Sequence, residues 1–129
     1  MSTDQIATPL GPYSHAKVGG GLIYCAGQLA LDPATSEPLT HLSAKEQTTV
    51  VLDNLRTVLD GFGATFDDVL RTTVYLARLD DYASMNEAYR AAFGQLRPAR
   101  ATIEVSALLG GLAVEIDAVA VAPKHGHNA

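Results

Sequence analysis

The chain has 129 residues, of which 47% are hydrophobic and 18% are charged, so its composition is that of one folded domain and excludes a disordered protein. The formal net charge is −5, and the nine Lys and Arg residues are scattered without a basic run, which argues against a nucleic-acid or anionic-membrane surface. An acidic protein that binds an anion needs a local positive site, so each arginine is of interest.

The N-terminal stretch MSTDQIATPLGPY lacks the basic and apolar regions of a secretory signal, and no apolar run approaches the ~20 residues of a membrane span. We expect a cytoplasmic protein that forms one domain over residues 1–129, with a core from about residue 6 to residue 122 and a flexible tail at 123–129. The single cysteine, Cys25, is interpreted as a core residue. His125 and His127 in the tail are a poor metal site, and no metal is expected.

The first predicted elements are a strand and a helix. The segment GGGLIYCAG (19–27) is typical of an apolar strand, and its glycine run predicts a turn because it lacks the Gly-Lys-Ser/Thr ending of a phosphate loop. The segment 41–64 is the clearest helix, with a capping box at Ser43 and Glu46. Its apolar stripe comprises Val51, Leu55, Val58, Leu59 and Phe62.

The second half of the chain is predicted to form a strand, a helix and two further strands. Residues 69–79 are β-branched and aromatic, and residues 80–95 form a helix whose stripe comprises Tyr82, Met85, Tyr89 and Phe93. Segments 100–108 and 112–123 read as strands joined by LLGG, which predicts a hairpin. The order predicts an α+β fold with both helices on one face of a mixed sheet. The other face must be solvated or covered by another subunit.

Arg100 stands at the head of a predicted strand, on the opposite face from Ala101, Ile103 and Val105, which we interpret as core. If the last two strands pair, the face away from the helices carries Arg100, Thr102, Glu104, Glu115 and Asp117. Two interpretations follow. Arg100 forms a structural ion pair with one of these carboxylates, or it binds a substrate carboxylate while Glu115 handles a proton or a water.

Several motifs occur at familiar distances along the chain. They are GPYSHA (11–16), YCAGQLALDP (24–33), MNEAYRAAF (85–93), RPARATIEV (97–105) and VEIDAVAV (114–121). Together they resemble the RidA/YjgF family, the reactive intermediate deaminases, from about residue 6 to residue 122. The resemblance implies a chorismate-mutase-like fold of the bacillary type, assembled as a homotrimer with sites in clefts between subunits.

The resemblance also implies an activity and its residues. Members of the family hydrolyse 2-imino and 2-enamino acids to 2-oxo acids and ammonia without a cofactor. Arg100 matches the arginine that binds the substrate carboxylate, and Glu115 matches the glutamate that activates or places water. Tyr13 and Asn86 match pocket residues, and Gly27 matches the glycine whose backbone lies near the substrate.

Two positions depart from the family pattern. Ala26 stands where serine is frequent, and Thr102, a candidate substrate-binding residue, stands where cysteine is frequent. Alternatives to the imine deaminase are an aminomuconate-type deaminase of the same fold, for which Ala26 leaves room, and a non-enzymatic trimeric protein that binds small carboxylates or acts like a chaperone. RNA cleavage is disfavoured by the acidic charge, and neither a nucleic-acid nor a membrane partner is expected.

Overall fold

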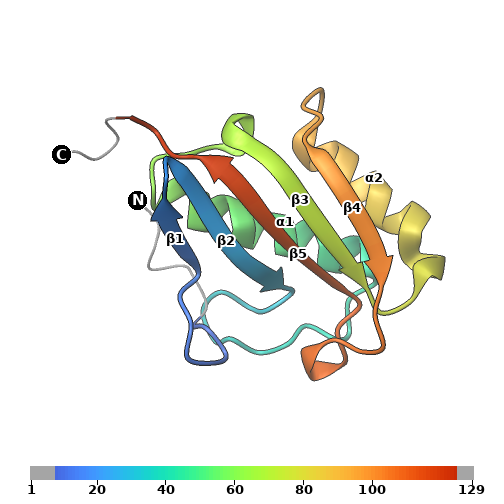
Figure 1. Ribbon diagram of the computed structural model, residues 1–129. Helices are drawn as coiled ribbons and strands as arrows, with labels where there is room; N and C mark the ends of the chain where they lie inside the picture. Colours follow the sequence, from blue (N-terminus) through green and yellow to red (C-terminus); the bar gives the residue numbers. More distant parts are fainter. Residues whose placement is uncertain (1–7, 125–129) are drawn as a thin grey trace.

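The computed structural model of the protein describes residues 8–124, which form a five-stranded sheet and two α-helices. Its strands lie in the spatial order β1-β2-β5-β3-β4 (Figure 1). They are β1 (Ala16–Gly19), β2 (Leu22–Leu29), β3 (Val69–Leu76), β4 (Ala99–Glu104) and β5 (Val114–Val121). The pair β3 and β4 is parallel, and the other neighbouring pairs are antiparallel, so the sheet is mixed as predicted.

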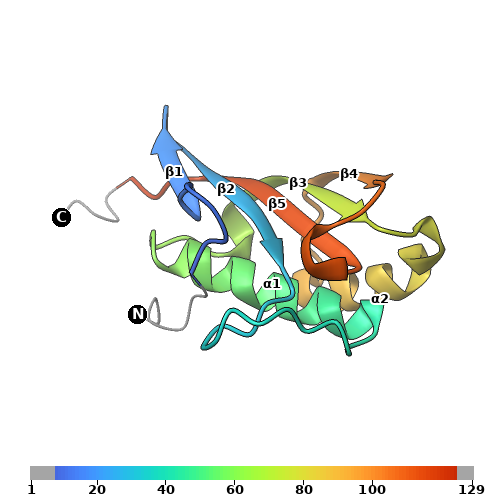
Figure 2. The same cartoon turned by 90° about the horizontal axis from the view of Figure 1, so that it is seen from below.

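Both helices, α1 (Ala44–Asp60) and α2 (Tyr82–Phe93), cover the same face of the sheet (Figure 2). The prediction of an α+β fold with helices on one face is confirmed. Neither helix of residues 8–124 has the length and hydropathy needed to cross a bilayer. His125, His127 and most of the tail predicted to be flexible lie outside the described residues.

The first helix is specified by its cap and its apolar stripe, as predicted. The Ser43 hydroxyl accepts the Glu46 backbone N–H at 3.1 Å, and the Glu46 carboxylate accepts the Ser43 N–H at 2.9 Å. The capping box therefore satisfies two backbone donors that the helix would otherwise leave free. The predicted stripe is buried except for Phe62, which packs against the core while partly exposed.

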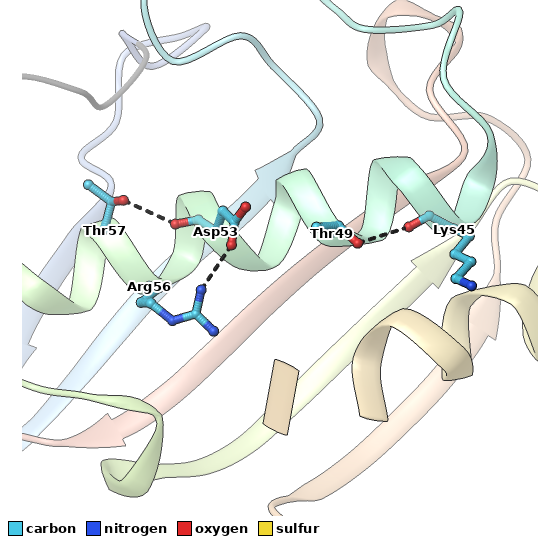
Figure 3. A network of polar contacts seen from close by, with 5 residues as sticks. All are labelled: Lys45, Thr49, Asp53, Arg56 and Thr57. Atoms are coloured by element: carbon cyan, nitrogen blue, oxygen red, sulfur yellow. Dashed lines mark hydrogen bonds and ion pairs between the residues drawn. The ribbon is translucent and has the colours of Figure 1, made fainter. Parts of the chain in front are cut away.

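The outer side of α1 carries polar side chains (Figure 3). An Arg56 nitrogen lies 2.9 Å from the Asp53 carboxylate, and the Thr57 hydroxyl donates to the Asp53 backbone carbonyl at 3.0 Å. Lys45 pairs with Glu87 of α2 at 3.1 Å. These side chains are largely exposed, and surface pairs of this kind contribute little stability. The burial of the inner stripe therefore holds α1 on the sheet.

The glycine run before β2 is a turn, as predicted. Gly20 and Gly21 join β1 to β2 with φ angles of 59° and 80°. Two successive residues with positive φ make a tight hairpin turn whose twist matches that of the strands, and glycine adopts this conformation without strain.

The predicted hairpin between the last two strands is wrong, because β3 lies between β4 and β5. Thr73 of β3 pairs with Ala101 on one side and with Asp117 on the other. The chain passes from β3 to β4 through α2, and a parallel neighbour can be reached only by such a crossover. The LLGG segment instead belongs to a longer connection that includes the 3₁₀ turn η4 (Leu109–Gly111).

The expected orientation of the β4 side chains, with Arg100 on the open face of the sheet, is also wrong. Arg100 pairs with Thr72, a fully buried residue whose hydroxyl lies 2.7 Å from that of Tyr89 on α2. Paired residues share a face, so Arg100 lies on the side that α2 covers. Ala101 and Ile103 face the open side instead, and Ile103 is 45% exposed.

The physical reason is the edge position of β4. At the rim of the helical layer a long cationic side chain can lie along apolar groups while its charged end stays near solvent. In β5 the residues Val114, Ile116, Ala118 and Ala120 are buried under the helices. Glu115 and Asp117 alternate with them and lie on the open face, away from Arg100.

Candidate functional site

Arg100 is held by the aromatic side chains of α2. Its guanidinium carbon lies 4.7 Å from the centroid of the Tyr89 ring and 5.6 Å from that of Tyr82. One nitrogen donates to the Tyr82 hydroxyl at 3.2 Å, and another makes a weak contact with the Met85 sulfur at 3.9 Å. A guanidinium has five N–H groups, so these contacts leave some of them for another acceptor.

No carboxylate pairs with Arg100 within residues 8–124. Glu104 instead accepts the Leu79 backbone N–H at 2.7 Å, and Asp117 accepts the Tyr75 hydroxyl at 2.9 Å. The described structure therefore gives no support to the interpretation of Arg100 as a structural ion-pair partner.

A hollow of about 350 Å³ opens beside Arg100, between α2 and the segment that leads into β4. Asn86 and Tyr89 of α2 line it together with Arg100. A hydrogen bond from Asn86 and the nearby charge of Arg100 lower the pKa of Tyr82. Thr102, half-buried, follows two residues after Arg100 on the same side of β4. The arrangement places a cationic side chain with polar neighbours beside an open hollow.

Glu115 lies on the other face of the sheet, above a β-bulge in β2. The register of β2 against β5 shifts between Cys25 and Gln28, and the intervening Gly27 lies under the Glu115 side chain. A Cβ at position 27 would overlap the carboxylate oxygen and would lie 2.8 Å from its carbon. The bulge and the glycine together create the space that the carboxylate occupies.

The electrostatic surroundings of Glu115 favour its protonated form. Burial and, second, the charge of Asp117 raise the pKa of Glu115. Asp117 is fixed by the Thr73 backbone N–H at 3.1 Å and by the Tyr75 hydroxyl at 2.9 Å. Burial and the bond to Asp117 raise the pKa of Tyr75, so that hydroxyl stays a donor. Glu115 is thus a more basic carboxylate than an exposed glutamate.

The structure therefore divides the predicted site residues into two groups. Arg100 and Asn86 come together at the hollow, with Thr102 on the same side of β4, while Gly27 and Glu115 meet on the opposite face. The expectation that Arg100 and Glu115 share a face is wrong, because β3 separates their strands and the two side chains point to opposite sides. A single chain does not bring them into one pocket.

Two other predicted residues lie elsewhere. Tyr13 precedes β1, is 48% exposed, and its N–H bonds to the Gly11 carbonyl at 2.8 Å. Cys25 is buried as predicted, and burial with the charge of Asp117 raises its pKa to about 12, so the thiol stays protonated and unreactive. The described residues contain no cluster of His, Cys, Asp and Glu that could hold a metal ion.

The sequence pattern places Tyr82 and Tyr89 in the packing stripe of α2 and gives no local sign that they contact Arg100. Their spacing of seven residues places both on one side of the helix. That spacing would have indicated an aromatic cradle if α2 had been recognised as the crossover that covers β4. The role of Tyr75 as a donor to Asp117 required the register of β3 against β5, which no local pattern gives.

Relatives match this chain over nearly its whole length. The family model described as Endoribonuclease L-PSP matches residues 3–122. A RutC family protein of Pyrococcus abyssi is 42% identical over 118 residues, covering 92% of this chain and 92% of that protein. A 2-iminobutanoate/2-iminopropanoate deaminase of Mus musculus is 39% identical over 121 residues, covering 94% of this chain and 89% of that protein.

Solved structures agree with these relatives. RidA from the Antarctic bacterium Psychrobacter sp. has a TM-score of 0.85 and 34% identity, covering 92% of this chain and 94% of its own. Escherichia coli TdcF with bound serine has a TM-score of 0.86 and 26% identity, covering 93% of this chain and 95% of its own. The fold and the site define a small α+β protein with an arginine beside a hollow at the sheet edge. The chain belongs to the Endoribonuclease L-PSP family, which is the RidA/YjgF family that its motifs resemble.

Gly27→Ala should lower the free energy of unfolding by about 1–3 kcal/mol, because the added methyl group overlaps the Glu115 carboxylate. Urea denaturation measures this. Gly19→Ala is the matched control, since a Cβ there meets nothing within 4 Å. Shortening Glu115 to Ala in the Gly27→Ala chain should relieve most of the cost. If the losses of unfolding free energy in the Gly27→Ala and Glu115→Ala single variants simply add in the double variant, the proposed steric coupling is wrong.

Asp117→Asn should lower the pKa of Glu115, because the substitution removes the like charge that disfavours ionisation. Asparagine can keep both bonds, since its oxygen accepts from Thr73 and the Tyr75 hydroxyl can accept from its amide. The titration of the Glu115 carboxyl carbon, followed by NMR, gives the result. Asp67→Asn, at an exposed position, is the control and should leave the titration unchanged. An unchanged Glu115 titration in Asp117→Asn would show that Asp117 does not raise the pKa of Glu115.

Proposed function

We propose that this protein is a hydrolase of reactive 2-imino and 2-enamino acids, of the 2-iminobutanoate/2-iminopropanoate type. The observation that carries the proposal is the half-buried Arg100, which faces a hollow and has no carboxylate partner in the part of the chain that is described. The planar fork of a guanidinium matches a carboxylate with two parallel hydrogen bonds. The name of the mouse relative and the serine bound to TdcF support a small α-substituted carboxylic acid as the ligand.

The proposed reaction needs positioning and one group that handles protons. Water attacks C2 of the imine and loses a proton as the C–O bond forms, while the imine nitrogen takes up a proton. In the resulting carbinolamine a second proton moves from the new hydroxyl group to the nitrogen, the C–N bond breaks, and ammonia leaves to give a 2-oxo acid. Glu115 would accept the proton from water, and its raised pKa makes it a better base than an exposed carboxylate. Arg100 would hold the substrate carboxylate so that C2 lies near that water. The proposed chemistry requires no metal or organic cofactor.

The remaining site residues receive supporting roles in this proposal. Asn86 and Thr102 would contact the substrate from the hollow side, and the Gly27 backbone would lie beside the reacting carbon together with Glu115. Tyr13 would close the pocket from the segment that precedes β1. An RNA substrate is disfavoured, because the net charge is −5 and RNA binding needs an extended basic surface.

The site would be completed by a second chain in a homotrimer. Arg100 and Glu115 lie on opposite faces of one sheet, so a pocket that contains both needs residues from two chains. The open face also exposes large apolar side chains, among them Tyr24 at 52% and Ile103 at 45%. Exposed apolar area of this kind favours a subunit interface.

The trimer is tested by sedimentation equilibrium at micromolar concentration, where we expect three times the chain mass. Ile103→Asp should raise the dissociation constant roughly a hundredfold or more and abolish activity, because it places a charge in the proposed interface. Val18→Asp is the matched control, since Val18 is exposed to a similar extent, 49%, on the other side of the sheet. A monomeric wild-type protein that still hydrolyses imines would refute the shared site.

Arg100→Ala should lower kcat/KM for 2-iminobutanoate about a hundredfold or more. A hydrogen bond to a charged group contributes about 1.5–3 kcal/mol, and each ~1.4 kcal/mol is a tenfold change in rate. Arg100→Lys should recover little, because an ammonium lacks the fork. Glu115→Gln should keep binding while turnover falls. The imine is generated in situ from an amino acid, and its decay is followed. Wild-type activity in an intact Arg100→Ala protein would refute the proposal.

A further inference from the structure

The hollow beside Arg100 is lined by two further arginines, Arg90 and Arg97. Together with Arg100 they make up three of the nine basic residues of a chain whose net charge is −5. No Asp or Glu lines this hollow in the described part of the chain. A local excess of positive charge against an acidic background selects anions, and it does so beyond what one carboxylate on Arg100 requires.

The two additional arginines differ in how they are held. Arg97 donates to the backbone carbonyl groups of Gly94 and Leu96, the latter at 3.0 Å, so its side chain is fixed at the end of α2. Arg90 is exposed and makes no ion pair within residues 8–124. A cation in the last turn of a helix also interacts favourably with the helix dipole. That effect concerns stability and does not depend on which ligand is bound.

The remaining lining indicates the shape of the ligand. Phe93, Leu96 and Pro98 supply apolar surface, and the rings of Tyr89 and Phe93 stack with centroids 4.6 Å apart. The hollow of about 350 Å³ lies within the range of roughly 300–1,000 Å³ that accommodates whole organic ligands. A short aliphatic imino acid held at Arg100 would leave space between its side chain and Arg90.

We propose that this hollow selects 2-imino acids whose side chain ends in a second carboxylate, which binds Arg90 while the first binds Arg100. Arg97 adds positive charge from a fixed position. The hydrolysis is unchanged: water adds to C2, ammonia leaves, and the product is a dicarboxylic 2-oxo acid. This inference rests on the proposed function, because it names the substrate class of the same site.

The activity test compares 2-iminoglutarate with 2-iminobutanoate, each generated in situ from the corresponding amino acid. We expect kcat/KM to favour 2-iminoglutarate tenfold or more. Arg90→Gln should lower kcat/KM about tenfold for 2-iminoglutarate and less than twofold for 2-iminobutanoate. Arg78→Gln is the control, because Arg78 is an exposed arginine outside the hollow that pairs with Asp80. Equal rates for the two imines, or equal losses in Arg90→Gln, would overturn the inference.

A binding test separates this inference from the proposed function. Calorimetry measures the dissociation constants of 2-oxoglutarate and 2-oxobutanoate, the stable products. We expect 2-oxoglutarate to bind at least tenfold more tightly, and Arg90→Gln to remove that advantage. Selective binding without imine hydrolysis would refute the proposed function and leave the dicarboxylate receptor. Hydrolysis of both imines without any selective binding would leave the function and refute the receptor.

Discussion

The parallel pairing of β3 with β4 is the constraint on which the arrangement of the site depends. The crossover through α2 allows β4 to run parallel to β3, and in the observed order β4 lies beside β3 at the sheet edge while β5 takes the other side of β3. The register then turns Arg100 toward the tyrosines of α2 and leaves Glu115 on the open face. One crossover thus decides which groups can meet within a chain and which require a second chain.

The part of the candidate site around Glu115 holds an ionisable group in surroundings that disfavour its charged form. Burial and the nearby Asp117 raise the pKa of Glu115. Below the ordinary glutamate pKa the folded and unfolded chains both carry the proton, so the group has no effect. As pH rises through the raised pKa, the unfolded chain releases its proton more readily and this residue destabilises the fold. Such a cost accords with the proton-handling role proposed for Glu115.

Local patterns in the sequence were sufficient to predict the helices and strands. They were not sufficient to predict which face of the sheet each side chain lies on. The capping box at Ser43, the stripe of α1 and the glycine turn depend on neighbours within a few residues, and all were predicted correctly. The pairing of β4 with β3 depends on residues far apart in sequence, so a hairpin with β5 was an equally good reading of the pattern. The error then reversed the faces of β4, because alternation carries one wrong assignment to every residue of a strand.

The same contrast between local patterns and contacts of distant segments applies to the site residues. The sequence singled out Arg100 and left open whether it pairs with a nearby carboxylate or binds a substrate, and the described structure shows no ion pair of Arg100. It could not identify the aromatic cradle of Tyr82 and Tyr89 or the space above Gly27, because both arise where distant segments meet. No local pattern singled out Arg90, which lines the same hollow as Arg100 in the structure.

The two edges of the sheet have a consequence for how chains can associate. An edge strand carries free backbone N–H and C=O groups and invites pairing with another chain, which leads to uncontrolled aggregation. Here β1 is only four residues long and ends in glycine, and β4 carries Arg100 and Glu104. Short length and charge are the features by which natural sheets discourage strand addition. These edges discourage the open-ended growth of strands. In the proposed trimer, contact would instead use the broad open face of the sheet, and association would stop at a defined number of copies.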